Sequence, residues 1–167
     1  NAFIDPDRQA EVIRSLRDSG RPMFNRAFRS AVPPGSTFKA VVAFSGLEAN
    51  RIDTQTRFEC PGYLKLGRAR FRCWREQGHG AQNVVEALIH SCNVFFYEIG
   101  RKLGVERLVQ AARLFGLGSA TGIDLPRESK GFVPDQEWMR KKHHQDWQPG
   151  DIVSLAVGQG ALLVTPL

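Results

Sequence analysis

The chain has 167 residues, of which 42% are hydrophobic and 24% charged, as in an ordinary globular domain with its own core. It contains no run of 18 apolar residues, so no part of this sequence is expected to cross a membrane. The net charge of +6 is spread along the chain and no nucleic-acid-binding motif accompanies it. A solvated basic surface is therefore favoured, and no nucleic-acid partner is expected.

The N-terminal half begins with an expected helix that starts at Asp5-Pro6 and ends near Gly20. Residues 25–34 are expected to be extended or irregular. A second helix is expected from Ser36 to about Leu47. Four of its side chains are expected to be mostly buried: Phe38, Val41, Val42 and Phe44.

The C-terminal half begins with a loop-rich excursion over residues 51–80, where short strands are expected around 63–66 and 70–74. Helices dominate the remainder, and glycines at 104 and 116 are expected to end two of them. The expected helical ranges are 83–90, 94–103, 106–115 and 135–142, with Phe95, Phe96 and Ile99 in the core. Residues 152–157 are expected to form a further helix or a buried run.

The most informative segment is Pro33-Pro34-Gly35-Ser36-Thr37-Phe38-Lys39. It predicts a rigid turn and then a helix whose first turn places the Ser36 hydroxyl and the Lys39 amine on one face. A partly desolvated lysine has a lowered pKa and can take the proton of a serine hydroxyl. The N–H groups of the helix N-terminus favour an oxyanion beside it. The pattern is that of an acyl-transfer nucleophile, although a capping serine beside a solvated lysine would also satisfy it.

A second motif, Ser91-Cys92-Asn93, lies 52 residues beyond Lys39. It matches the S-x-N signature that accompanies S-x-x-K in penicillin-interacting enzymes. Taken alone it is also compatible with a polar turn in which Asn93 caps the following helix.

Further short motifs follow one another in a fixed order. They are Asn25-Arg26-Ala27, Pro34 to Lys39, Cys60-Pro61-Gly62, His79-Gly80, Asn93 to Tyr97, Gly122 to Pro126, Val157 to Gly160 and Thr165-Pro166-Leu167. The ordered set covers nearly the whole chain and resembles the transpeptidase domain of class B penicillin-binding proteins. The branch it most resembles is penicillin-binding protein 2, which acts in cell elongation.

The resemblance implies a mostly α fold, the helical portion of the serine D,D-transpeptidase/β-lactamase-like α+β fold. It implies an enzyme that cross-links the D-Ala-D-Ala stem peptides of peptidoglycan through a serine acyl-enzyme and that β-lactams acylate. Ser36 would be the nucleophile and Lys39 the general base. Ser91 would relay a proton to the leaving amine, and Asn93 would hold the substrate amide and the lysine.

The same resemblance implies a location at the periplasmic face of the bacterial inner membrane. Family members are anchored there by a helix near their N-terminus. The implied partner of the parent protein is a membrane glycosyltransferase of the elongation machinery.

One family signature, K-[ST]-G, is absent from the chain, since Ser129-Lys130-Gly131 has the wrong order. In the family this motif lies on a strand beyond the position of Leu167. Residues 1–167 are therefore expected to be a partial transpeptidase domain from which most sheet strands are missing. By itself such a chain is expected to be inactive or very weak.

Three cysteines and a histidine form the pattern C-x12-C-x5-H-x12-C: Cys60, Cys73, His79 and Cys92. Three thiolates and one imidazole are a standard ligand set for structural zinc, and the loop-rich excursion needs a staple. The interpretation is a zinc ion that ties the S-x-N loop to the excursion through Cys92. The resemblance adds that some relatives carry Asp, His and Cys ligands here, so two of the cysteines would replace aspartates.

A disulfide between Cys60 and Cys73 is the alternative, because disulfides persist in the periplasm, although it leaves an odd cysteine. Two other functional classes stay open. One is a serine β-lactamase or β-lactam sensor of the same fold, and the other is a zinc-stapled interaction module in which Ser36 and Lys39 are incidental. The remaining histidines are expected to be surface or core residues: His90, His143 and His144.

Overall fold

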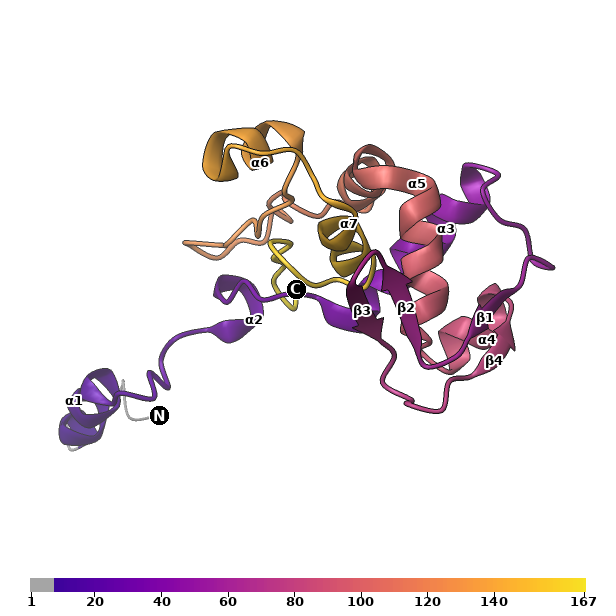
Figure 1. Ribbon diagram of the computed structural model, residues 1–167. Helices are drawn as coiled ribbons and strands as arrows, with labels where there is room; N and C mark the ends of the chain where they lie inside the picture. The colour runs from indigo at the N-terminus through magenta and orange to yellow at the C-terminus, as the bar shows by residue number, and fades with distance from the viewer. Residues whose placement is uncertain (1–7) are drawn as a thin grey trace.

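Helices account for most of the regular structure in the computed structural model of the chain, which describes residues 8–167 (Figure 1). The predicted mostly helical fold is therefore confirmed. The elements are, in order, α1 (Gln9–Arg17), α2 (Arg26–Arg29), the 3-10 helix η2 (Gly35–Phe38), α3 (Lys39–Glu48), β1 (Phe58–Cys60), β2 (Tyr63–Leu66), β3 (Ala69–Arg72), β4 (Gly80–Gln82), α4 (Val84–Ile89), α5 (Asn93–Leu114), α6 (Gln136–His143) and α7 (Pro149–Ala156).

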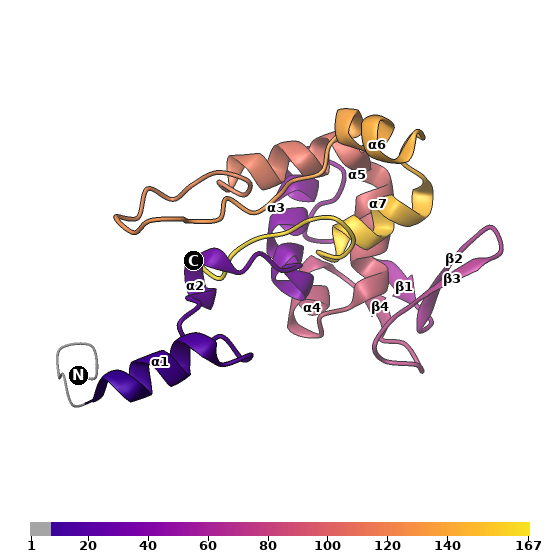
Figure 2. The same cartoon turned by 90° about the vertical axis from the view of Figure 1, so that its left-hand side faces the viewer.

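The core forms around α5, which packs against both α3 and α7 (Figures 1 and 2). As predicted, Phe95, Phe96 and Ile99 are fully buried, and burial of each such side chain stabilises the fold by about 1.5–3 kcal/mol. The two helices α5 and α7 approach closely at Gly100, where an added Cβ would lie 2.5 Å from the Cβ of Ala156. Only glycine fits at that crossing.

The long helix α5 is broken at Gly104, whose φ of 73° and ψ of 170° are not helical. Glycine adopts this left-handed φ without the steric penalty that a Cβ brings. The break lies where the sequence predicts the end of one helix and the start of the next. It separates the segment that carries the S-x-N motif from the segment that ends at Leu114.

Two small antiparallel sheets lie in the excursion. In one, β1 pairs with β4 so that Cys60 is opposite Gly80. In the other, β2 and β3 form a hairpin whose two-residue turn has Gly67 at a φ of 57°, as hairpin turns favour. The strands β2 and β3 lie where short strands were expected, around 63–66 and 70–74, whereas their pairing and the β1–β4 pair were not predicted.

Several expectations were wrong or cannot be compared. Residues 26–29 form the short helix α2, because the Asn25 side chain accepts a hydrogen bond from the Ala27 N–H at 3.1 Å and caps it. Phe44 is 42% exposed and packs edge-on against Phe115 instead of entering the core. The predicted helix start at Asp5-Pro6 lies outside the described residues. Helix α1 buries none of its side chains and stands apart from the body (Figure 2).

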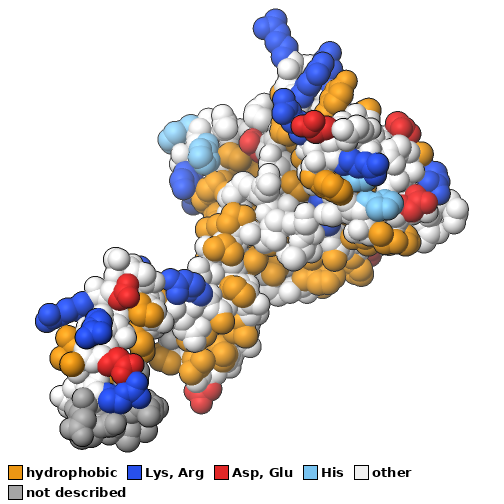
Figure 3. Space-filling model, turned by 90° about the horizontal axis from the view of Figure 1, so that it is seen from below, with side chains coloured by type: hydrophobic (Ala, Val, Ile, Leu, Met, Phe, Trp, Pro, Cys, Tyr) orange, Lys and Arg blue, Asp and Glu red, His pale blue; other side chains and the backbone are white. Residues whose placement is uncertain are grey.

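The surface carries apolar side chains as well as charged ones (Figure 3). Helix α4 buries Val84 and Ala87 and exposes Val85, Leu88 and Ile89 on its other face. Among residues 8–167, no helix combines the length and the apolar character that a bilayer crossing requires.

Candidate active site and metal centre

The predicted nucleophile lies at the start of η2. Ser36 is exposed, and the 3-10 geometry of this turn nearly eclipses positions three apart, which places Ser36 and Lys39 on one side of the helix. The sequence predicts an α-helix from Ser36. The structure differs because the first turn is 3-10 and the α-helix begins only at Lys39.

The turn before Ser36 is fixed by contact with the segment that follows α7. The Gly35 N–H donates to the Gly158 carbonyl at 2.9 Å. An added Cβ at Gly158 would lie 2.2 Å from the Gly35 carbonyl oxygen, and Gly158 has a φ of 69°. Glycine is required at position 158 on both counts, and no pattern in the sequence indicates that these two glycines meet.

Lys39 is only 1% exposed, and its ammonium group reaches the S-x-N loop. Its Nζ donates to the Ser91 carbonyl at 2.8 Å, to the Ser91 Oγ at 3.0 Å and to the Asn93 Oδ1 at 2.6 Å. These bonds use the three donors of an ammonium group, and every acceptor is neutral. Burial lowers the pKa of Lys39 to about 8, and the nearby thiols of Cys73 and Cys92 oppose that shift. A lysine in this state releases its proton far more readily than one in water.

The S-x-N loop connects α4 to α5. Ser91 has a left-handed φ of 49°, and Asn93 is the first residue of α5. The Asn93 side chain does not cap the helix. Its oxygen accepts from Lys39, and its Nδ2 donates to the Arg72 carbonyl at 3.4 Å.

Tyr97 is a residue of this site that the sequence reasoning missed. Its hydroxyl donates to the same Arg72 carbonyl at 3.2 Å, and burial raises its pKa to about 12. The spacing of four residues between Asn93 and Tyr97 places both on one helix face and could have indicated the relationship. Their shared acceptor, the Arg72 carbonyl, is a backbone group, so no residue type in the sequence indicates it.

The structure thus brings Lys39, Ser91 and Asn93 into direct contact, with Ser36 one helical turn away. Within residues 8–167 the Ser36 hydroxyl makes no hydrogen bond. An exposed hydroxyl, a buried lysine with a lowered pKa and two polar side chains bonded to that lysine can support acyl transfer on serine. Their individual catalytic roles stay predictions.

The four predicted metal ligands also converge. The ligand atoms of Cys60, Cys73, His79 and Cys92 all lie within 4.8 Å of one another, and the three cysteines are free thiols. Cys60 ends β1, Cys73 follows β3, and Cys92 is the N-cap residue of α5. Their backbone is held together by the bonds Cys73 N–H to Gly62 carbonyl at 2.8 Å and His79 N–H to Cys60 carbonyl at 2.9 Å.

The His79 ring is oriented toward the thiols. Its Nδ1 lies 3.5 Å from the Cys60 Sγ and 3.6 Å from the Cys73 Sγ, while its Nε2 is buried with no hydrogen-bond partner among the described residues. The ring stacks on His90, with centroids 5.7 Å apart, and meets Trp74 edge-on at 5.2 Å. Burial, followed by the charge of Arg75, lowers the pKa of His79, which favours the neutral imidazole that metals bind.

The buried thiols differ in acidity. Burial raises the pKa of Cys92 to about 12. Burial also raises the pKa of Cys73, but backbone N–H groups, including those of Asn93 and Val94 at the start of α5, outweigh it and leave the pKa below its ordinary value. A set of soft sulfur donors with one imidazole suits zinc better than it suits hard cations.

Comparison with known proteins relates most of the chain to one family. Residues 3–167 match the family described as the penicillin binding protein transpeptidase domain. The chain is 40% identical over 156 residues to the peptidoglycan D,D-transpeptidase MrdA of Acinetobacter baumannii. This alignment covers 92% of this chain and 23% of that protein. It is 37% identical over 169 residues to MrdA of Escherichia coli K12, covering 100% of this chain and 27% of that protein. The chain therefore spans about a quarter of the length of these relatives.

Solved structures agree in fold. Pseudomonas aeruginosa PBP2 in complex with WCK 5153 superposes with a TM-score of 0.88 at 37% identity, covering 93% of this chain and 36% of that one. Helicobacter pylori PBP2 in complex with MreC also gives a TM-score of 0.88, at 38% identity, covering 93% of this chain and 30% of that one.

Proposed function

Because the chain belongs to the family of penicillin-binding protein transpeptidase domains, we propose that its protein is a peptidoglycan D,D-transpeptidase that works through an acyl-enzyme on Ser36. The observation that carries the proposal is the triple hydrogen bonding of the buried Lys39 Nζ to Ser91 and Asn93. A surface lysine without a function would not be buried among neutral acceptors, since burial disfavours its charge.

In the proposed reaction, neutral Lys39 takes the proton of the Ser36 hydroxyl as its oxygen attacks the carbonyl of the penultimate D-alanine of a stem peptide. The bond between the two D-alanines breaks, and Ser91 passes a proton to the departing D-alanine amine. Asn93 holds the substrate amide and keeps Lys39 in place. An amine of a neighbouring stem peptide then attacks the ester, which forms the cross-link and returns the proton to Ser36.

β-Lactams are proposed to acylate Ser36 by the same attack, with the lactam amide in place of the peptide bond. A hydrolytic β-lactamase or a β-lactam sensor would share Ser36 and Lys39. The curated relatives quoted above favour the transpeptidase, because both are named as transpeptidases.

The test is covalent labelling by fluorescent penicillin in a complete transpeptidase domain that contains this chain. Ser36→Ala should abolish the label, and Ser45→Ala, which alters a buried serine of the following helix α3, should retain it. Labelling that persists in Ser36→Ala would rule out the assignment.

We also propose the setting of the whole protein. Residues 1–167 would be part of a single transpeptidase domain at the periplasmic face of the inner membrane, with residues 51–80 as an excursion. A membrane glycosyltransferase of the elongation machinery would be its partner. The support is an analogy. A chain that superposes on this one with a TM-score of 0.85 belongs to a peptidoglycan synthase complex described as coordinating polymerization and crosslinking.

We further propose that Cys60, Cys73, His79 and Cys92 hold one structural zinc ion. Four donors within 4.8 Å of one another, all three cysteines as free thiols, and a buried imidazole facing two of them support this set. When bound, zinc would supply a cross-link among these loops and no catalytic chemistry.

The same residues position the S-x-N loop. Cys92 lies between Ser91 and Asn93, and Cys73 follows Arg72, whose carbonyl accepts from Asn93. A metal bound by Cys73 and Cys92 would therefore restrict the movement of two segments: the loop with Ser91 and Asn93, which accept hydrogen bonds from Lys39, and the Arg72 backbone, which accepts one from Asn93. A Cys60–Cys73 disulfide is the competing state, and thiol titration together with zinc analysis separates the two.

A further inference from the structure

The Tyr97 hydroxyl and the Asn93 amide meet at one backbone acceptor. The two side chains lie one turn apart on the same face of α5, and both donate to the Arg72 carbonyl. Tyr97 donates from its hydroxyl at 3.2 Å and Asn93 from its Nδ2 at 3.4 Å. A carbonyl oxygen has two lone pairs, so these two donors use its full capacity. Tyr97 therefore acts on the S-x-N motif through the backbone of β3, and within the described residues its hydroxyl makes no hydrogen bond to Lys39 or Ser36.

Packing fixes the position of the Tyr97 ring. Tyr97 is 6% exposed, and its ring lies edge-on to that of Phe71, with centroids 6.0 Å apart. Phe71 is in turn close to α7, because a Cβ added at Gly150 would lie 3.0 Å from its ring. Burial raises the pKa of Tyr97 to about 12, so the hydroxyl keeps its proton and stays a donor at neutral pH. The Arg72 carbonyl thus has a donor that is held in place.

The Asn93 amide has two different ends, and only one of them suits a neighbouring base. Its oxygen accepts hydrogen bonds and its nitrogen donates them. The Oδ1 lies 2.6 Å from the Lys39 Nζ, and the Nδ2 points to the Arg72 carbonyl. A neutral lysine amine has one lone pair, which has to be free to take the Ser36 proton. An amide turned end for end would donate its N–H to that lone pair and compete with the serine.

The charge of Lys39 decides when the orientation of the amide needs support. A protonated amine has only donors, so it selects the amide oxygen unaided. The neutral amine is the form that acts as a base, and it both donates and accepts. It therefore does not distinguish the two ends of the Asn93 amide. The Arg72 carbonyl does, because it can only accept.

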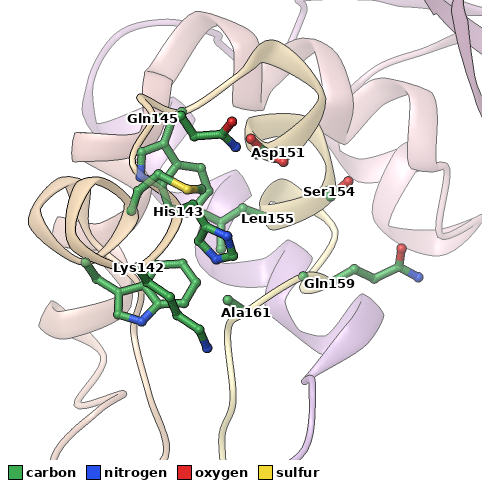
Figure 4. Close-up of a pocket in the computed structure, with 12 residues that line it drawn as sticks. Lys142, His143, Gln145, Asp151, Ser154, Leu155, Gln159 and Ala161 are labelled. Carbon is green, nitrogen blue, oxygen red and sulfur yellow. The ribbon is translucent and has the colours of Figure 1, made fainter.

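The polar side chains of α7 do not serve this purpose, although α7 packs on α5. Asp151 and Ser154 line a cavity between α6 and α7 (Figure 4). The Asp151 carboxylate accepts from the backbone N–H of the helix's N-cap residue at 3.0 Å, and the Ser154 hydroxyl donates to the backbone carbonyl four residues earlier at 2.9 Å. Both are engaged within their own helix. Among residues 8–167, the Arg72 carbonyl is the single hydrogen-bond partner of the Asn93 amide nitrogen.

We propose that Tyr97 is a positioning residue for the acylation step. Its hydroxyl holds the Arg72 carbonyl, which engages the Asn93 Nδ2 and so keeps the Oδ1 toward Lys39. The lone pair of the neutral lysine is then free for the Ser36 proton. The inference rests on the proposed function, in which Lys39 is the base, and it adds a residue that acts on that base from a distance.

The experiment compares the two tyrosines of the chain in a complete transpeptidase domain that contains it. Tyr97→Phe removes the hydroxyl and keeps the ring. Tyr63→Phe is the matched control, because the Tyr63 ring stacks under Arg70 while its hydroxyl makes no hydrogen bond among the described residues. Stopped-flow acylation at increasing penicillin concentration separates the binding constant from the first-order acylation rate. Tyr97→Phe should lower that rate about three- to tenfold, as for one lost hydrogen bond, and Tyr63→Phe should leave it unchanged.

A second background separates positioning from a purely structural role. In Asn93→Asp the side chain has two equivalent oxygens, so there is no amide end to select. It still offers an acceptor to Lys39, and acylation should remain measurable. Within this background, Tyr97→Phe should change the first-order rate less than about twofold. A hydroxyl that only stabilises the fold would instead slow both backgrounds equally.

The inference would be overturned by an unchanged rate in Tyr97→Phe, by an equal loss in Tyr63→Phe, or by the same loss from Tyr97→Phe in both backgrounds. Acylation too slow to measure in Asn93→Asp would also count against it, because the oxygen that faces Lys39 is what the proposal requires at position 93. In each of these cases the unaltered domain is still acylated on Ser36. Failure of the unaltered domain to be acylated, or labelling that persists in Ser36→Ala, would overturn the proposed function and this inference with it.

Discussion

The Lys39 Nζ lies 2.6 Å from the Asn93 Oδ1, across a sequence separation of 54 residues. This contact joins the nucleophile's helix to the first residue of α5 and is the shortest of the three that the ammonium group makes. Because all three acceptors are neutral, none repays the cost of burying the positive charge as a carboxylate would. Ser91 and Asn93 therefore hold the Lys39 side chain in place without strongly stabilising its protonated form.

The first prediction concerns the base. In a complete transpeptidase domain, Lys39→Ala should slow acylation by penicillin by about 10² or more, because general-base catalysis is lost. Lys65→Ala, which removes an exposed lysine of β2, should leave the rate unchanged. Stopped-flow measurement of the second-order acylation rate distinguishes them, and an unimpaired Lys39→Ala variant would contradict the role of base.

The second prediction concerns pH. Burial places the pKa of Lys39 at about 8, and the neutral amine is the form that accepts a proton. The acylation rate should therefore rise about tenfold per pH unit below that value and level off above it. The measurement is the acylation rate between about pH 6 and pH 9.5, with circular dichroism to verify that the fold persists. A rate that is flat or falls with rising pH across this window would count against Lys39 as the base.

The third prediction concerns Gly158. In Gly158→Ala the new Cβ would lie 2.2 Å from the Gly35 carbonyl oxygen, in addition to the strain of a φ of 69°. Left-handed strain costs about 1–2 kcal/mol and overpacking about 1–3 kcal/mol more, so a loss of about 2–5 kcal/mol in unfolding free energy is expected. The acylation rate should also fall, because the turn before Ser36 moves.

The control for this substitution is Gly160→Ala. Gly160 has a φ of 82° but nothing within 4 Å of an added Cβ, so only the strain should remain. Urea denaturation of both variants gives the two losses. If they are equal, the close approach of Gly158 to Gly35 does not contribute to stability.

The fourth prediction concerns the metal. Protein purified without reductant should contain about one equivalent of zinc and no disulfide, and a chelator should lower its melting temperature, because a loop-rich site derives folding free energy from the metal. Affinity should fall as pH drops, since burial raises the pKa of Cys92 to about 12 and the metal must displace the thiol proton. Elemental analysis, thiol titration and thermal melting provide the measurements.

Two histidines supply a matched pair for this test. His79→Ala should lose zinc, whereas His90→Ala should keep it, because His90 stacks on the His79 ring but is not one of the four converging ligands. Metal-free protein with a Cys60–Cys73 bridge would show that the disulfide alternative is the real state.

The sequence predicted the features that local chemistry determines. Gly104 ends a helix because only glycine tolerates its backbone angles, and the strands β2 and β3 lie where short strands were expected. The family resemblance is confirmed by the match over residues 3–167. It had already placed Ser36, Lys39, Ser91 and Asn93 in one site by analogy before any distance was known.

Features that depend on contacts between distant segments were not predictable. Phe44 looked like a core residue by its spacing, but its neighbour is Phe115, near the surface. The pairing of β1 with β4 involves three-residue strands, too short for a periodicity to register. The Arg72 carbonyl and the Gly35–Gly158 contact involve backbone atoms. Every residue has these atoms, so the residue types in the sequence do not indicate where such contacts form.

The β2–β3 hairpin has a consequence for handling this protein. Its exposed two-residue tip, Gly67-Arg68, takes no part in the contacts that hold its base, where Phe71 packs against Tyr97 and the Cys73 N–H bonds to the Gly62 carbonyl. Such tips accept insertions and proteolytic nicks with little loss of structure. A reporter peptide or a fluorophore could therefore be inserted at this tip, where an added Cβ at Gly67 has nothing within 4 Å and the base of the hairpin would keep its contacts.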